Sequence, residues 1–162
     1  MKKGFTFIEI LVVIALIGII SLATSQIFFT VLQSESKGEI TKEVKQNGDY
    51  ALSVIEQMTR NAQDVDISNC NNSGTSFTIT NSDGGTTIFD CSTTQISSNS
   101  SFLTNTLVDV SSCSVNVVCP TPATSPKYVY INFTLSQHGP TAGVAQNASE
   151  TYQSTITLRN YK

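Results

Sequence analysis

The hydrophobic pattern changes twice along the chain, and the first pattern is a nearly unbroken apolar run. Between residues 10 and 22 only Gly18 and Ser21 interrupt the aliphatic side chains, and apolar residues recur as far as residue 32. About 20 largely apolar residues are enough for a helix to cross a bilayer. We therefore predict a transmembrane helix over residues 5–32.

The second pattern is an apolar stripe with helical spacing. Its members recur at intervals of three, four and seven, and they are Ile40, Val44, Ala51, Val54, Ile55, Met58, Ala62 and Val65. This spacing predicts that the helix continues as an amphipathic segment over residues 33–66, as one helix from about residue 6 to residue 64. The stripe is expected to pack on a sheet, rather than on a separate partner. Gly38 and Gly48 each cost about 1 kcal/mol relative to alanine and are candidate bends.

Beyond residue 65 the pattern alternates with a period of two, which is typical of strands. Residues 76–81 and 86–91 flank a Ser-Asp-Gly-Gly turn and predict a hairpin. Further strands are expected at 107–110, 115–118, 128–135 and 154–159. The sequence thus predicts an α+β fold, in which a long N-terminal helix packs on an antiparallel sheet formed within residues 67–162.

Charge and composition narrow the class of protein. Charged residues make up 13% of the 162 residues, and the net charge is −3. Without Lys2 and Lys3 the balance is −3 − 2 = −5, which gives no basic footprint for nucleic acid. The region beyond residue 65 is rich in Ser, Thr and Asn, as exported β-rich domains are.

Four cysteines, Cys70, Cys91, Cys113 and Cys119, lie in this region. None forms a CxxC pair, and the single histidine, His138, is distant in sequence, so a zinc site is not indicated. An even number in an exported chain favours two disulfides, for which three pairings are possible. We favour Cys70–Cys91 and Cys113–Cys119 because each pair is close in sequence; buried free thiols are the alternative.

Lys2 and Lys3 precede the apolar run, which predicts a cytoplasmic N-terminus and a C-terminal domain outside the cytoplasm. A cleaved secretory signal is an alternative, since Ser21-Leu22-Ala23 resembles its cleavage site. However, the apolar residues continue beyond that point, and Glu9 has no use in such a signal. A simple one-pass anchor explains neither Glu9 nor the junction of Gly4 and Phe5.

Glu9 is the unusual residue of the apolar segment. A charged side chain in hydrocarbon costs roughly 2.5–3.5 kcal/mol even on insertion scales, and such residues usually have a partner. If Lys2 and Lys3 are removed by processing, we expect no internal partner for Glu9. Its partner would then belong to another molecule.

Residues 3–9, Lys-Gly-Phe-Thr-Phe-Ile-Glu, followed by Ile-Leu-Val-Val-Ile-Ala, resemble the N-terminus of type IV pilin precursors and type II secretion pseudopilins. The resemblance implies that residues 1–4 are a leader, cut between Gly4 and Phe5 by prepilin peptidase. It also implies N-methylation of Phe5 by the same peptidase/methyltransferase. Glu9, the fifth mature residue, would pair with the Phe5 amine of a neighbouring pilin or pseudopilin subunit and so support assembly.

Two looser similarities favour a minor subunit. Residues 47–65 and 155–160 are similar to the helix end and the closing strand of J-type minor pseudopilins and W-type minor pilins. Major pilins often have a proline early in the mature helix, whereas the first proline here is Pro120 and Gln26 lies near the usual position. The N-terminal motif is shared by pilus, competence and secretion machines, so it does not choose among them.

The sequence contains no recognisable catalytic motif, such as a phosphate-binding loop, HExxH or Gly-x-Ser-x-Gly. His138 lies in a Gly-Pro loop, Asp83 precedes a Gly-Gly turn, and no segment has calcium-loop spacing. We therefore expect no enzyme, cofactor or metal, and a structural subunit in the cytoplasmic membrane and then in a filament. The alternatives are a tip adhesin, a module that binds substrate or DNA, and, most remotely, a membrane-anchored enzyme.

Overall fold

The computed structural model describes residues 4, 6–66, 70–121, 126–139 and 148–159. It contains two compact units, residues 1–38 and residues 39–162. One helix, α1 (Phe7–Asn61), runs through both units. It is the only element in the described part of the first unit, and it is the first element of the second unit. It ends three residues before the expected end at residue 64, because the chain turns into strand β1 at Asp64.

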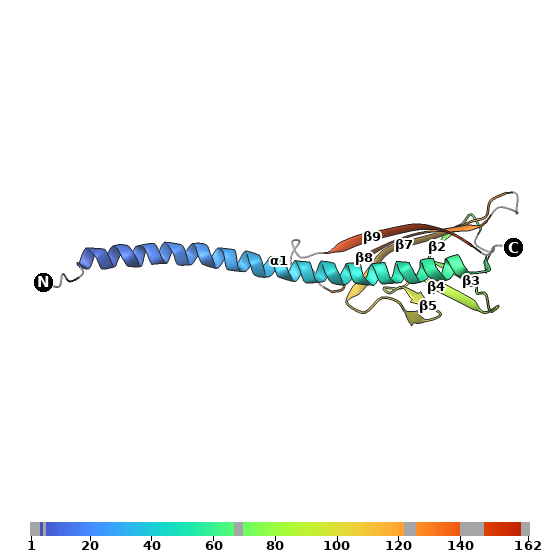
Figure 1. The fold of residues 1–162 in the computed structure, drawn as a ribbon, viewed down its shortest axis with the longest axis horizontal. Coiled ribbons are helices and arrows are strands. Elements are labelled where there is room, and N and C mark those ends of the chain that lie inside the picture. Colours follow the sequence, from blue (N-terminus) through green and yellow to red (C-terminus); the bar gives the residue numbers. More distant parts are fainter. Residues whose placement is uncertain (1–3, 5, 67–69, 122–125, 140–147, 160–162) are drawn as a thin grey trace. The chain divides into compact units, whose positions relative to one another are not determined.

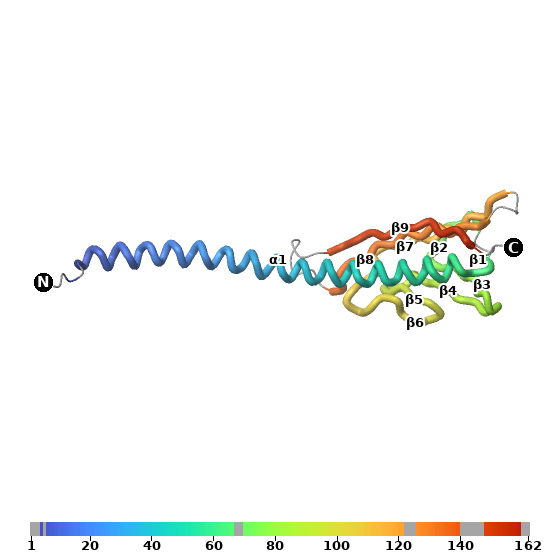
Figure 2. Tube along the Cα trace, viewed as in Figure 1, coloured from blue at the N-terminus to red at the C-terminus, as the bar shows by residue number. Residues whose placement is uncertain are grey.

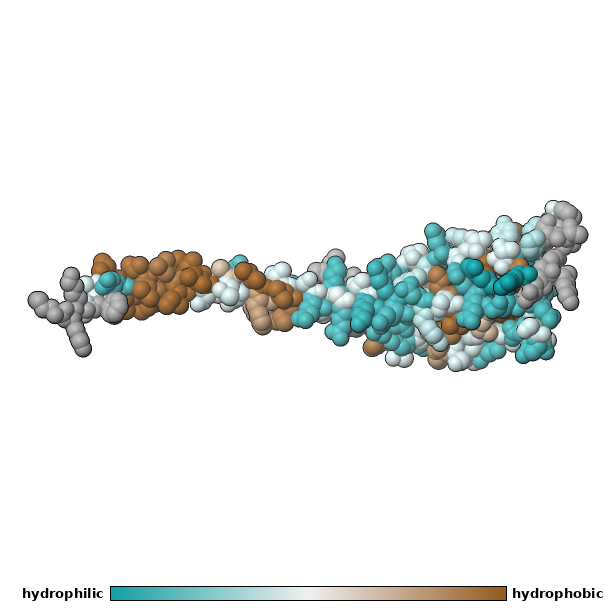
Figure 3. Space-filling model, in the orientation of Figure 1, coloured by the Kyte–Doolittle hydropathy of each residue, from teal (hydrophilic) through white to brown (hydrophobic). Residues whose placement is uncertain are grey.

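In the first unit, α1 has exposed apolar side chains on all sides, from Phe7 to Leu32. An 18-residue window of the helix has a mean hydropathy of 2.7 and no buried residue. This apolar zone appears as the brown segment of the space-filling view (Figure 3). By length and composition, the helix is therefore able to cross a membrane.

The second unit contains two antiparallel sheets (Figures 1 and 2). The first has the strand order β1-β3-β4-β5-β6, and the second has the order β2-β7-β8-β9. The strands are β1 (Asp64–Val65), β2 (Ser73–Gly74), β3 (Ser76–Thr80), β4 (Thr86–Asp90), β5 (Ser97–Ser98), β6 (Ser101–Phe102), β7 (Val108–Val118), β8 (Tyr128–Gln137) and β9 (Ser149–Thr157). In Figure 1, β9 runs above the second half of α1, and β4 and β5 lie below it.

The core lies between α1 and the inner faces of both sheets. The helix buries Val44, Gly48, Ala51, Ile55 and Thr59, at spacings of three and four. The sheets contribute alternate residues of their strands, chiefly Phe77, Phe89, Val115, Val117, Val129, Ile131, Phe133, Leu135 and Ile156. The expected α+β fold, with a long helix on antiparallel strands, is confirmed.

The strands differ from expectation in their lengths. The strands expected at 107–110 and 115–118 are parts of one strand, β7, which begins at Val108. The register of its pairing with β8 shifts between Val110 and Ser112, which leaves a bulge at Ser111. β9 begins at Ser149 and ends at Thr157, earlier than expected at both ends. The hairpin of β3 and β4 forms as predicted, with Phe77 opposite Phe89. The two-residue strands have no pattern long enough to be recognised in the sequence.

Gly48 allows the closest approach between α1 and β9. The ring of Tyr152 occupies the space where a Cβ at position 48 would be. The Tyr152 hydroxyl donates to the carbonyl oxygens of Val44, at 3.3 Å, and Lys45, at 3.5 Å, and its ring stacks on Phe133 at 5.2 Å. Gly48 is thus a packing position and not a bend, whereas Gly38 has open space around it.

We predict opposite effects for alanine at these two glycines. Gly48→Ala should destabilise the protein by about 1–3 kcal/mol, because the methyl group displaces the Tyr152 ring. Gly38→Ala should leave stability unchanged or raise it by up to about 1 kcal/mol, through better helix propensity. Thermal unfolding of the full-length protein in detergent checks both. Equal effects of the two substitutions would contradict the proposed packing.

Tyr152 should also make stability depend on pH in alkaline solution. Burial, and then the negative charges of Asp49 and Glu150, raise the pKa of Tyr152 from 10.0 to about 12. Because the folded pKa is above the unfolded one, this contribution is complete below pH 10 and is lost as the pH rises toward 12. Denaturant unfolding of the wild type and Tyr152→Phe should therefore show a difference in stability that shrinks over this range. A constant difference would contradict the assignment.

Candidate processing and assembly site

The start of α1 places the Glu9 carboxylate against Thr6. Thr6 precedes the first helical residue, and Glu9 is the third, which is the Thr-x-x-Glu spacing of a capping box. The Thr6 backbone N–H and hydroxyl both donate to Glu9 Oε2, at 2.9 Å and 3.0 Å. The Glu9 backbone N–H in turn points to Thr6 Oγ1 at 3.4 Å. This reciprocal bonding explains why the helix begins at Phe7.

The expectation that Glu9 has no internal partner is therefore wrong in one respect. Thr6 is an internal hydrogen-bond partner, and the Thr-x-x-Glu spacing that indicates it is visible in the sequence. Thr6 is neutral, and none of the ion pairs among the described residues includes Glu9. The capping box thus satisfies the hydrogen bonding of the carboxylate but leaves its charge without a counterion in the described part of the chain.

The predicted cleavage site lies immediately before this cap. Gly4 is exposed, and a Cβ built on it would meet no atom within 4 Å. Phe5, the predicted new N-terminus and methylation site, lies outside the described residues. The Thr6 and Glu9 side chains are exposed, so the cap lies at an open end of the helix. Cleavage after Gly4 and methylation of Phe5 remain predictions.

All four cysteines form disulfides, but the favoured pairing is wrong. The structure joins Cys70 to Cys119 and Cys91 to Cys113, with Cα–Cα distances of 5.5 Å and 6.2 Å. A bond between Cys113 and Cys119 is excluded by the length of β7. Both residues lie on or just after one extended strand, and six residues at about 3.3 Å each separate them by roughly 20 Å.

The path of residues 70–76 explains the observed pairs. Cys70 bridges Val117, and β2 pairs with β7 through Ser73 and Asn116, so this segment begins beside the end of β7 and near Cys119. The chain then crosses to the other sheet and starts β3 at Ser76. Cys91, which follows the partner strand β4, is thereby brought to the crossing and to Cys113. Proximity in sequence could not reveal this crossover.

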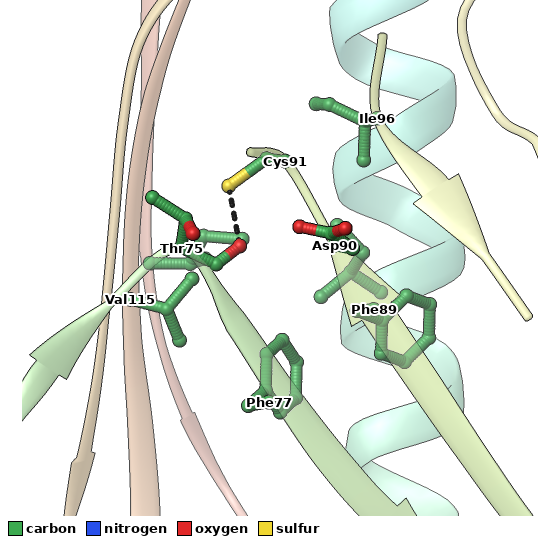
Figure 4. A pocket seen from close by; sticks show the side chains of 9 residues that line it. Thr75, Phe77, Phe89, Asp90, Cys91, Ile96 and Val115 are labelled. Carbon is green, nitrogen blue, oxygen red and sulfur yellow. Dashed lines mark hydrogen bonds between the residues drawn. The ribbon is translucent and has the colours of Figure 1, made fainter. Parts of the chain in front are cut away.

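Cys91, one half of the second disulfide, borders a small apolar cavity in the core (Figure 4). Phe77 and Phe89, stacked at 5.2 Å between ring centroids, and Ile96 line it. The Cys91 backbone N–H donates to the Thr75 carbonyl oxygen at 2.9 Å, which fixes Cys91 at the crossing. The disulfide therefore links the end of β4, in the first sheet, to β7, in the second sheet, beside this cavity.

The other polar candidates have local structural partners. His138 Nδ1 lies 2.8 Å from Asp109 Oδ2 in an exposed pair at the start of β7. Asp83 Oδ1 accepts from the Gly85 backbone N–H at 2.9 Å, as expected for a turn residue. Lys127, buried except for a small fraction, donates to Asp64 Oδ1 at 2.6 Å. Among the described residues, no three His, Cys, Asp or Glu side chains gather as metal ligands would.

Comparison with known proteins supports the interpretation of the N-terminus. Residues 1–25 match the family model described as the prokaryotic N-terminal methylation motif. No curated protein and no solved structure gives a significant match to the chain.

The motif and the fold of a long helix on antiparallel sheets are consistent with a pilin-like protein. The motif supports a type IV pilin or pseudopilin subunit that is processed by prepilin peptidase. It covers residues 1–4, the Thr6–Glu9 cap and the first part of the apolar helix, which are the residues on which the resemblance in the sequence rests.

The disulfide pairing can be checked by peptide mapping without reduction. We expect linked fragments that contain Cys70 with Cys119 and Cys91 with Cys113. Removing a pair should cost roughly 4 kcal/mol for the wider loop and roughly 3 kcal/mol for the narrower one, from the entropy of the unfolded chain. Denaturant unfolding of the two double serine variants, one for each disulfide, shows which removal lowers the stability more. Linkage of Cys70 to Cys91 would contradict the structure.

Proposed function

We propose that the chain is a minor structural subunit of a type IV pilus, competence pilus or type II secretion pseudopilus. The observation that carries this proposal is the methylation motif over residues 1–25, which contains the cleavage junction and Glu9 at the start of an apolar helix. The looser similarities of residues 47–65 and 155–160, and the absence of an early proline, favour a minor role.

In this proposal the apolar part of α1 has two successive environments. The precursor would hold residues 5–32 in the cytoplasmic membrane, with residues 67–162 outside the cytoplasm. After cleavage the same side chains, exposed from Phe7 to Leu32, would pack against the helices of neighbouring subunits. Both environments are apolar, so transfer from lipid to filament would not require this helix to become soluble.

Glu9 would distinguish the two environments. In the isolated subunit its carboxylate is held by the neutral donors of Thr6. In the filament the Phe5 amine of a neighbour would supply the missing positive charge. A charge-assisted hydrogen bond contributes roughly 1.5–3 kcal/mol, which is enough to favour one axial position of the subunit over others. The cap would thus hold the carboxylate near the helix start until that amine is available.

Three substitutions separate the charge of Glu9 from its capping role. Glu9→Gln keeps an oxygen that can accept from Thr6 but removes the charge, whereas Glu9→Ala removes both. We expect both variants to insert into the membrane and both to enter filaments at least tenfold less than the wild type, because about 1.4 kcal/mol corresponds to a factor of ten. Immunoblots of sheared filaments measure the assembled subunit, and immunoblots of membranes measure the inserted but unassembled subunit.

Thr6→Ser, which keeps the capping hydroxyl, is the matched control and should assemble normally. Mass spectrometry of each variant should find Phe5 as the methylated N-terminus, so that a failure of processing is not mistaken for a failure of assembly. Normal assembly of Glu9→Gln would show that the cap, and not the charge, is what matters. An N-terminus other than Phe5 in the wild type would overturn the proposed function itself.

A further inference from the structure

The sheet β2-β7-β8-β9 has an outer face, opposite α1, that carries no charge over most of its area. Side chains alternate along β8, so Val129, Ile131, Phe133 and Leu135 are buried while the residues between them point outward. From the bulge of β7 onward, the outward positions of β7, β8 and β9 are Ser, Thr, Asn, Gln and Tyr, with one Val. The charged pair of Asp109 and His138 lies beyond the bulge, at one end.

The register aligns these residues in rows across the strands. One row runs Ser73–Asn116–Tyr130–Thr155, and the next runs Ser114–Asn132–Gln153. Three strand spacings of about 4.8 Å make the first row roughly 14 Å long. β8 is paired on both sides along most of its length, so the rows are held on a rigid support.

Hydrogen-bonding groups in these rows are unengaged. Among the described residues, the side chains of Ser114, Asn132, Gln153 and Thr155 make no hydrogen bond to one another or to the rest of the protein. Asn116 Oδ1 is covered from solvent and also has no hydrogen-bond partner among the described residues. By contrast, hydroxyls nearer the bulge bond to each other, as Thr134 and Thr151 do at 2.9 Å. The side chains of Ser114, Asn132, Gln153 and Thr155 are therefore available to a ligand, whereas Asn116 Oδ1 is covered.

Tyr130 gives this polar face an aromatic centre. Tyr130 is 36% exposed and lies on β8, between β7 and β9, and Tyr128 lies two positions before it on the same face. The face of an aromatic ring carries partial negative charge and packs well against weakly positive C–H groups. A pyranose ring offers C–H groups on its faces and hydroxyls around its edge, which matches a tyrosine surrounded by amides and hydroxyls.

The charge pattern decides between ligand classes. A polyanion such as nucleic acid needs Lys or Arg, and these rows contain neither. A charged sugar would lose hydration without gaining a counterion. An apolar peptide would need a contiguous hydrophobic patch, which amides and hydroxyls do not provide. We propose that the outer face around Tyr130 binds an extended, uncharged polysaccharide. This proposal rests on the proposed function in one respect only, which is that the face is exposed outside the cell.

Two cellulose derivatives with the same backbone test the proposal. Full-length protein in detergent micelles is immobilised, and binding of hydroxyethyl cellulose is compared with binding of carboxymethyl cellulose, which carries carboxylates. We expect the neutral polymer to bind more tightly. Tyr130→Ala should weaken this binding roughly tenfold by removing the aromatic platform. Asn132→Asp, which adds a charge at nearly constant size, should weaken it as well.

Tyr50→Ala is the matched control, because Tyr50 is 57% exposed but lies on α1 rather than on the sheet. It should change binding less than twofold, and thermal unfolding of every variant shows whether the fold is retained. No binding by the wild type, equal binding of both polymers, or equal loss in Tyr50→Ala would overturn the proposal. The micelle assay requires no filament, so its failure leaves the assembly function standing, and failed assembly of the Glu9 variants leaves this result unaffected.

Discussion

The second unit depends on the burial of one narrow face of α1. Val44, Ala51 and Ile55 are fully buried against both sheets, and Gly48 lets the Tyr152 ring approach the helix backbone. Other contacts reinforce this face from its edges: Lys45 pairs with Glu150, and Ser154 donates to Glu56. Without the helix, both sheets would expose their apolar inner faces to water, so the β-rich region cannot be a separate folding unit.

α1 keeps a helical backbone throughout, but the distribution of apolar side chains around its axis changes along its length. Up to residue 32 its apolar side chains surround the axis, whereas in the second unit they are confined to one stripe. A helix satisfies its own backbone hydrogen bonds, so it is stable in lipid, between other helices or on a sheet. The termini of such a helix are its weak points, and the Thr6–Glu9 capping box stabilises the one that begins the apolar segment.

Elements with a long repeated pattern could be predicted from the sequence. The stripe from Val44 to Ala62, the β3–β4 hairpin and β8 are of this kind, because each shows its buried face several times. The sequence alone does not distinguish a bend from a packing position at Gly48, because the residue that packs on it, Tyr152, lies 104 positions away. The cysteine pairing depends on the crossover of residues 70–76 between the sheets, which proximity in sequence does not reveal. The Thr6 cap is indicated by the local Thr-x-x-Glu spacing, which gives Glu9 a neutral partner three residues away and not a charged one.

The nested arrangement of the disulfides has a consequence for the order of oxidation. Cys70–Cys119 encloses Cys91–Cys113 in sequence, and synthesis produces Cys70 and Cys91 before either native partner exists. The two thiols that are available first are therefore a non-native pair. Premature oxidation would join them and prevent residues 70–76 from crossing between the sheets. Efficient maturation then requires one of two conditions. Either the cysteines are oxidised only after β7 has formed, or a thiol–disulfide isomerase exchanges the early bond.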